Sequence, residues 1–111
     1  MKRTPLRKRN PERKARLTEE QFGPLARRKW IKMQPCVIPG CGAWPCENVH
    51  VTSRGAGGTP EDIVPMCAEH HRKLHGLNSG IETFQAEHGV DLRALAEWTQ
   101  TRWILYQGKR Q

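Results

Sequence analysis

The spacing of apolar side chains predicts helices on both sides of a central segment. One begins at Pro24, a residue suited to the first turn of a helix, and ends near Met33. Another fits residues 81–88, and the longest begins after Asp91 and runs to about residue 106. This last helix carries an apolar stripe that we expect to pack onto the domain: Leu92, Leu95, Ala96, Trp103 and Tyr106.

The central segment predicts two short strands followed by a helix. Residues 46–52 alternate between apolar and polar around His50, which is typical of a strand. A glycine-rich loop at residues 53–60 leads to a second short strand at residues 63–64, and residues 68–74 fit a helix. The order strand, strand, helix, with further helices at both ends, predicts a small α+β domain.

The first residues predict a basic, flexible arm. From residue 1 to 16 nearly every second residue is Lys or Arg, and Pro5 and Pro11 argue against a helix. We therefore expect an extended arm at residues 1–17 and a single domain at residues 18–111, with a core at residues 36–76. Contact with phosphate is the favoured role of the arm, against that of a solubilising tail.

Composition restricts the class of partner and the compartment. The chain has 111 residues, a hydrophobic fraction of 36% and a formal net charge of +8, so a small core and a polyanionic partner are expected. No apolar stretch follows the basic start, and none is long enough to span a bilayer. We expect an intracellular, cytoplasmic protein with no membrane partner, whose cysteines are metal ligands or core residues.

Two close pairs of ligand-type residues predict a structural zinc ion. Tetrahedral zinc takes four Cys or His ligands, which sequences usually supply as two pairs separated by a loop. Here Cys36 and Cys41 form one pair, and Cys67 and His70 form the other. Cys46 is an alternative to His70 as the fourth ligand. Isolated cysteines are often small buried apolar residues, but two pairs around a turn and a helix start favour zinc.

Three further histidines indicate a second, catalytic site. His71 and His75 are four residues apart on a predicted helix, so their side chains share one face and can bind one cation. Histidine also suits the role of the general base that deprotonates an attacking water, which His50 can take from its strand. A single histidine on a strand is more often inert, and it is the order of the surrounding elements that favours catalysis.

These residues resemble the HNH endonucleases, whose fold is two strands and a helix around a metal (ββα-metal). The resemblance covers residues 36–76 and is most specific in the segment VPMCAEHHRKLHG at 64–76, while flanking residues resemble a subgroup found in phages and prophages. It implies His50 as general base, Asp62 in place of the middle Asn, and His75 as ligand of the cation. Val49 stands where many relatives have a metal-binding Asp or His, so the cation would depend on His71, His75 and water.

The resemblance implies an endonuclease that hydrolyses DNA phosphodiester bonds with one Mg²⁺ or Mn²⁺. A monomer with one such centre is expected to nick one strand. Cutting both strands would require two copies, as in a weak dimer, or two binding events. Arg54, Arg72 and Lys73 are candidates for phosphate contacts, or else ordinary surface charge. The expected setting is a bacterial or phage-encoded protein that works on DNA, beside packaging or recombination proteins.

Two other functions compete with the nuclease. A zinc-ribbon-like module that binds nucleic acid without turnover would need neither His50 nor His75. A zinc-dependent hydrolase or deaminase is the other, weaker alternative, because Cys and His ligands also build catalytic zinc sites. A nucleobase deaminase would need a glutamate two residues after the histidine, and Thr52 stands at that position. The deaminase is therefore disfavoured.

Overall fold

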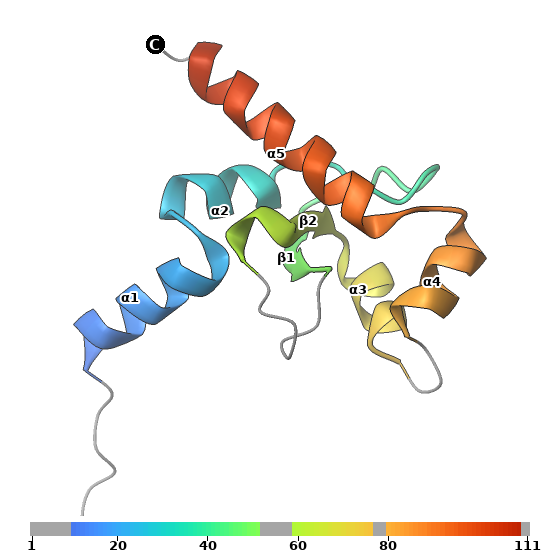
Figure 1. Cartoon of the computed structure of the whole chain (residues 1–111), viewed down its shortest axis with the longest axis horizontal. Coiled ribbons are helices and arrows are strands. Elements are labelled where there is room, and N and C mark those ends of the chain that lie inside the picture. Colours follow the sequence, from blue (N-terminus) through green and yellow to red (C-terminus); the bar gives the residue numbers. More distant parts are fainter. Residues whose placement is uncertain (1–9, 52–58, 77–79, 110–111) are drawn as a thin grey trace, which may run out of the picture.

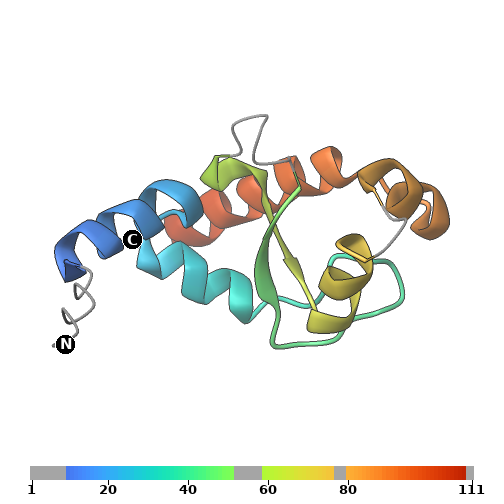
Figure 2. The same ribbon diagram turned by 90° about the horizontal axis from the view of Figure 1, so that it is seen from below.

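A computed structural model describes residues 10–51, 59–76 and 80–109. Along the chain these residues form the following elements: α1 (Pro11–Phe22), α2 (Leu25–Lys32), β1 (Glu47–His50), the 3₁₀ turn η2 (Pro60–Asp62), β2 (Ile63–Met66), α3 (Ala68–Leu74), α4 (Ile81–His88) and α5 (Leu92–Lys109). The two strands lie at the centre, with α2 and α3 on either side of β1 and α5 running past β2 (Figures 1 and 2). The predicted small α+β class is confirmed.

The two strands form an antiparallel ribbon. Glu47 pairs with Met66 at one end, and His50 pairs with Ile63 at the other. All of β2 is buried, because α5 packs against it. Pro65 is tolerated inside β2 because each strand of a two-stranded sheet keeps an edge that needs no pairing. The prediction placed both strands correctly and erred by one or two residues at their ends.

Helix α1 contradicts the predicted extended arm. Asn10 caps the helix, since its Oδ1 accepts the backbone N–H of Glu12 at 3.0 Å, and Pro11 occupies the first helical position. Proline lacks only an N–H that the first turn of a helix leaves unpaired, so here it starts a helix. The expected boundary at residue 17 therefore falls inside α1. Residues 1–9 lie outside the described part of the chain.

The other helices follow the prediction closely. Helix α2 begins after Pro24, α3 spans residues 68–74 as expected, and α4 ends at Gly89 in the left-handed conformation. Asp91 caps α5, because its Oδ1 accepts the backbone N–H groups of Arg93 and Ala94 at 3.0 and 3.2 Å. In the described ranges no helix has the length and apolar character that crossing a membrane requires.

The core is small, and the charged side chain of Arg27 is buried in the domain. Apolar side chains of the ribbon meet those of α3, α4 and α5, and the largest fully buried ones in this cluster are Met66, Phe84 and Leu92. Arg27 of α2 is buried, and its Nε and Nη2 donate to Oε1 of Gln100 on α5 at 3.2 and 3.0 Å. Burial lowers the pKa of Arg27. This contact joins α2 to α5 across the domain.

Candidate metal centre

Cys36 and Cys41 are presented by a tight loop between α2 and β1. The N–H of Cys36 donates to the carbonyl of Ala43 at 2.9 Å, and that of Cys41 donates to the carbonyl of Ile38 at 3.0 Å. Gly40 and Gly42, on either side of Cys41, have φ values of 81° and 62°. Side chains disfavour this left-handed region, so the two glycines let the loop turn both thiols toward α3.

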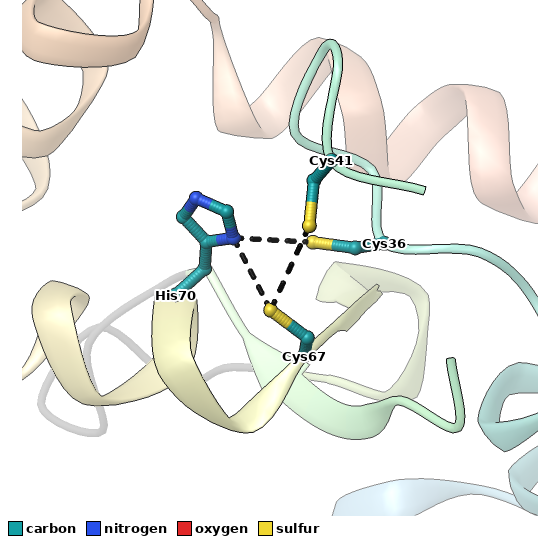
Figure 3. A group of neighbouring side chains, drawn as sticks. All are labelled: Cys36, Cys41, Cys67 and His70. Atoms are coloured by element: carbon teal, nitrogen blue, oxygen red, sulfur yellow. Dashed lines mark hydrogen bonds between the residues drawn. The ribbon is translucent and has the colours of Figure 1, made fainter. Parts of the chain in front are cut away.

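Cys67 and His70 come from the start of α3. Cys67 is the N-terminal cap of this helix, and His70 lies three residues later, on the same face. Figure 3 shows Nδ1 of His70 directed at the sulfur atoms of Cys36 and Cys67, from which it is 3.6 and 3.2 Å away. The sulfurs of Cys41 and Cys67 are 3.8 Å apart. All four ligand atoms lie within 4.8 Å of one another.

These distances fit a tetrahedral zinc ion. Zinc bonds of about 2.3 Å to sulfur and about 2.05 Å to nitrogen place sulfurs about 3.8 Å apart, and sulfur and nitrogen about 3.6 Å apart. The distances from Cys36 Sγ to His70 Nδ1 and from Cys41 Sγ to Cys67 Sγ match these values. The distance from Cys67 Sγ to His70 Nδ1 is 3.2 Å, which is slightly shorter. Three thiols and one imidazole are also a common donor set of structural zinc sites. The predicted group can therefore hold zinc.

Cys46 is not part of this group. It is buried at 3% exposure, and its thiol donates to the carbonyl of Ala43 at 3.3 Å. Burial raises the pKa of this thiol to about 11, which keeps it protonated. Of the two candidates for the fourth ligand, the structure selects His70, and Cys46 is a core residue.

Zinc would compete with protons for the ligand atoms of this group. Burial raises the pKa of Cys36 to about 12, so without a cation this thiol stays neutral. A hydrogen bond from the backbone of Ala43 lowers the pKa of Cys41. Burial, and then His88, lowers the pKa of His70, which keeps its imidazole neutral as a ligand must be. Binding of zinc at this site would therefore release protons.

His88 is a neighbour of the metal group that sequence reasoning did not find. Its ring contacts those of His70 and Phe84, with centroids 5.2 and 4.3 Å away. Its Nε2 is buried and has no hydrogen-bond partner among the described residues. Helical spacing within α4 places His88 next to Phe84, but only the packing of α4 on α3 brings it to His70.

His71 and His75 lie together as predicted, with ring centroids 4.9 Å apart. They line an open cavity at the surface together with Glu47 and Arg72. Nδ1 of His71 lies 2.8 Å from Oε1 of Glu47, and because a carboxylate only accepts, Nδ1 carries the proton. In the neutral ring the lone pair of His71 is then on Nε2. Glu47 is a neighbour of His71 that the sequence did not reveal, because β1 and α3 meet only in the fold.

His50 lies against α1. Its Nε2 is 2.6 Å from the carbonyl oxygen of Gln21, and its ring centroid is 4.8 Å from that of Phe22. A carbonyl oxygen only accepts, so Nε2 carries the proton and donates it. In the neutral ring Nδ1 is therefore the basic nitrogen. The helix that the sequence analysis missed thus fixes which nitrogen of His50 can act as a base.

Asp62 has a local structural role at the same end of the ribbon as His50. Its Oδ2 accepts the backbone N–H of Thr59 at 3.0 Å, and its carbonyl accepts the N–H of Val51 at 3.0 Å. The carboxylate thus closes η2 and fixes the chain where the glycine-rich loop ends. Asp62 is not among the metal-holding groups of the described residues.

The structure does not bring His50 into contact with His71 or His75. His50 ends β1 beside α1, whereas Glu47, which holds His71, begins β1. Three residues of strand separate these positions by about 10 Å, and strand alternation directs their side chains to opposite faces.

The predicted phosphate contacts differ in their surroundings. Arg72 lines the cavity beside His71 and His75. Lys73 is exposed, and its Nζ lies 3.7 Å from Oε1 of Glu69, one turn earlier on α3. Arg54 lies outside the described residues.

Comparison with known proteins adds no family to these observations. Neither a scan against protein-family models nor searches of curated proteins and of solved structures found a match to this chain.

Proposed function

We propose that this chain is a metal-dependent endonuclease of the HNH type that cuts DNA. Zinc bound by Cys36, Cys41, Cys67 and His70, the Cys3His group, is its structural ion. The observation that carries the proposal is the position of His71 directly after the zinc ligand His70 on α3. Consecutive residues of a helix point about 100° apart. The face of α3 that carries His70 therefore contacts the cysteine loop, and the neighbouring face, which carries His71, lines the cavity. The Cys3His group thus positions a helix that presents His71 and His75 to solvent.

The chain's own residues supply a base and an oriented cation site. His50 accepts a proton from the attacking water at Nδ1, while the Gln21 carbonyl holds Nε2. Glu47 holds Nδ1 of His71, which leaves Nε2 to bind a cation. Metal-binding histidines are commonly held in this way. A divalent cation bound there would stabilise charge on the phosphoryl oxygens and the leaving group. Arg72 supplies a positive charge beside the same cavity.

His50 and the histidine pair could act on one phosphodiester only if the substrate passed from one face of β1 to the other, because strand alternation directs the side chains of Glu47 and His50 to opposite faces. The edge of β1 that does not pair with β2 is the path between them. The substrate would cross this edge.

The test is nicking of supercoiled plasmid DNA in Mg²⁺ or Mn²⁺. His50→Ala and His71→Ala should keep one zinc ion and the fold, and lose cleavage by about a hundredfold or more. Gln21→Ala is the matched control, because it removes a side chain and keeps the carbonyl that holds His50. Cleavage that is equal in the wild-type protein and in both histidine variants would refute the proposal.

A zinc-fastened module that binds nucleic acid without turnover is the second candidate. The observation that favours it is the absence of contact between His50 and the histidine pair among the described residues. In that case wild-type protein would bind DNA with a steep salt dependence and would not nick it with either cation.

A further inference from the structure

A groove between α2 and the C-terminal half of α5 has no role in the proposed nuclease. It encloses about 820 Å³. In Figure 1, α2 and the C-terminal half of α5 lie on the side of the domain away from α3 and α4. Its walls carry apolar side chains that reach solvent, among them Leu25, Met33 and Leu105. Met33 and Leu105 are exposed at 61% and 60%. Such a contiguous apolar surface is a typical interaction site.

The floor of the groove is joined to the core. The ring of Trp30 contacts those of Trp103 and Tyr106, with centroids 5.4 and 5.9 Å away, and Trp103 is buried. The guanidinium of Arg102 lies 5.8 Å from the Trp30 ring centroid, and its Nη2 donates to Oε1 of Gln34 at 2.9 Å. These contacts hold both helices at a fixed separation. The groove is therefore formed before any partner binds.

The groove is positively charged. Lys29, Arg102 and Lys109 line it, and neither Asp nor Glu does. In the described part of the chain, none of these three cations lies within ion-pair distance of a carboxylate. A partner with acidic side chains would therefore gain ion pairs here without breaking any described ion pair.

We propose that the groove binds an acidic amphipathic helix of another protein. Two helices flanking an apolar floor accept the apolar face of a third helix, which anchors at positions i, i+3, i+4 and i+7. Glutamates and aspartates beside those anchors would meet Lys29, Arg102 and Lys109. The inference stands on the groove alone and does not depend on the nuclease.

Two other occupants fit less well. A second copy of the chain would bring the same three cations against themselves, in a protein of net charge +8. A single strand of nucleic acid needs open aromatic faces for its bases. Trp30 is half-buried against Trp103, Tyr106 and Arg102, and much of the remaining apolar wall is aliphatic.

The test uses the full chain and a fluorescent helical peptide with leucines at i, i+3, i+4 and i+7 and glutamates on its other faces. A scrambled peptide of the same composition keeps the charge and removes the apolar face. We expect the amphipathic peptide to bind at least about tenfold more tightly than the scrambled one, by fluorescence anisotropy. Equal binding of the two peptides would show that only charge attracts them, and it would overturn the proposal.

Leu105→Glu and Ile104→Glu form a matched pair of variants. The two side chains are neighbours on α5, exposed at 60% and 56%, and of the two only Leu105 lines the groove. Leu105→Glu should weaken peptide binding by about tenfold or more, and Ile104→Glu should change it little. Circular dichroism checks that both variants keep the fold. Equal effects of the two variants would refute binding in the groove.

The same variants distinguish the other occupants. Analytical ultracentrifugation that shows a wild-type dimer and a monomeric Leu105→Glu variant would assign the groove to a second copy. A single-stranded oligonucleotide that binds more tightly than the peptide, and loses affinity in Leu105→Glu but not in Ile104→Glu, would assign it to nucleic acid. Either result would overturn the proposal.

Discussion

Replacing Cys36 or Cys46 by alanine should have very different consequences, although both are buried cysteines of the same segment. Cys36 and Cys46 are exposed at 6% and 3%, so each substitution removes one sulfur from a similar environment. That packing loss costs about 1 kcal/mol in either variant. Only Cys36 belongs to the Cys3His group. The difference between the two variants therefore isolates the contribution of the metal.

The size of that contribution follows from the small core. Structural zinc sites contribute about 10–16 kcal/mol of apparent binding free energy at neutral pH, whereas a domain of this length has about 5–15 kcal/mol of stability in total. Loss of the ion therefore removes as much free energy as the folded state has. Cys36→Ala should lose zinc and its cooperative unfolding transition. Cys46→Ala should keep one zinc ion per chain and shift the midpoint by about 4–8 °C.

The assay combines native mass spectrometry for zinc content with differential scanning calorimetry. Addition of a strong chelator to the wild-type protein should reproduce the unfolding seen in Cys36→Ala. The reasoning would be wrong if Cys36→Ala kept a full zinc ion, if Cys46→Ala lost it, or if the chelator left the transition of the wild-type protein unchanged.

Other consequences follow from single contacts. Gln100→Ala leaves the buried Arg27 without both of its bonds to Oε1 and should cost about 2–3 kcal/mol in urea unfolding, whereas Gln100→Glu should cost less because it keeps an acceptor. Asp91→Ala removes the cap of α5 and should lower stability by about 1 kcal/mol, with Asp91→Asn close to the wild type. Because burial raises the pKa of Cys36 to about 12, zinc uptake should release protons and weaken as pH falls, which calorimetry in buffers of different ionisation enthalpy measures.

Local spacing predicted the metal group and failed where tertiary contacts decide. Two pairs of ligands, two glycines and a short helix are encoded within a few residues each, so Cys36, Cys41, Cys67 and His70 could be found from the sequence. The sequence could not exclude Cys46 as the fourth ligand, because only the fold shows that its thiol donates to the carbonyl of Ala43.

Helix α1 was missed for a different reason. In the sequence alone Pro11 argues against a helix, but after Asn10 it is the first residue of one. Without α1, the contact between His50 and the carbonyl of Gln21 could not be predicted, because Gln21 lies in this helix. Glu47 was missed because β1 and α3 are far apart in the sequence and meet only through the ribbon.

The neighbours His70 and His71 offer a test of whether the two faces of α3 have separate roles. Nδ1 of His70 faces the sulfurs, whereas Nδ1 of His71 bonds to Glu47 beside the open cavity. His70→Ala should therefore lower both zinc content and stability, and its loss of cleavage should follow the loss of fold. His71→Ala should keep zinc and the unfolding midpoint and lose only cleavage, by about a hundredfold or more. If both variants lost zinc equally, or if His71→Ala cleaved as the wild type does, α3 would serve the structural site alone.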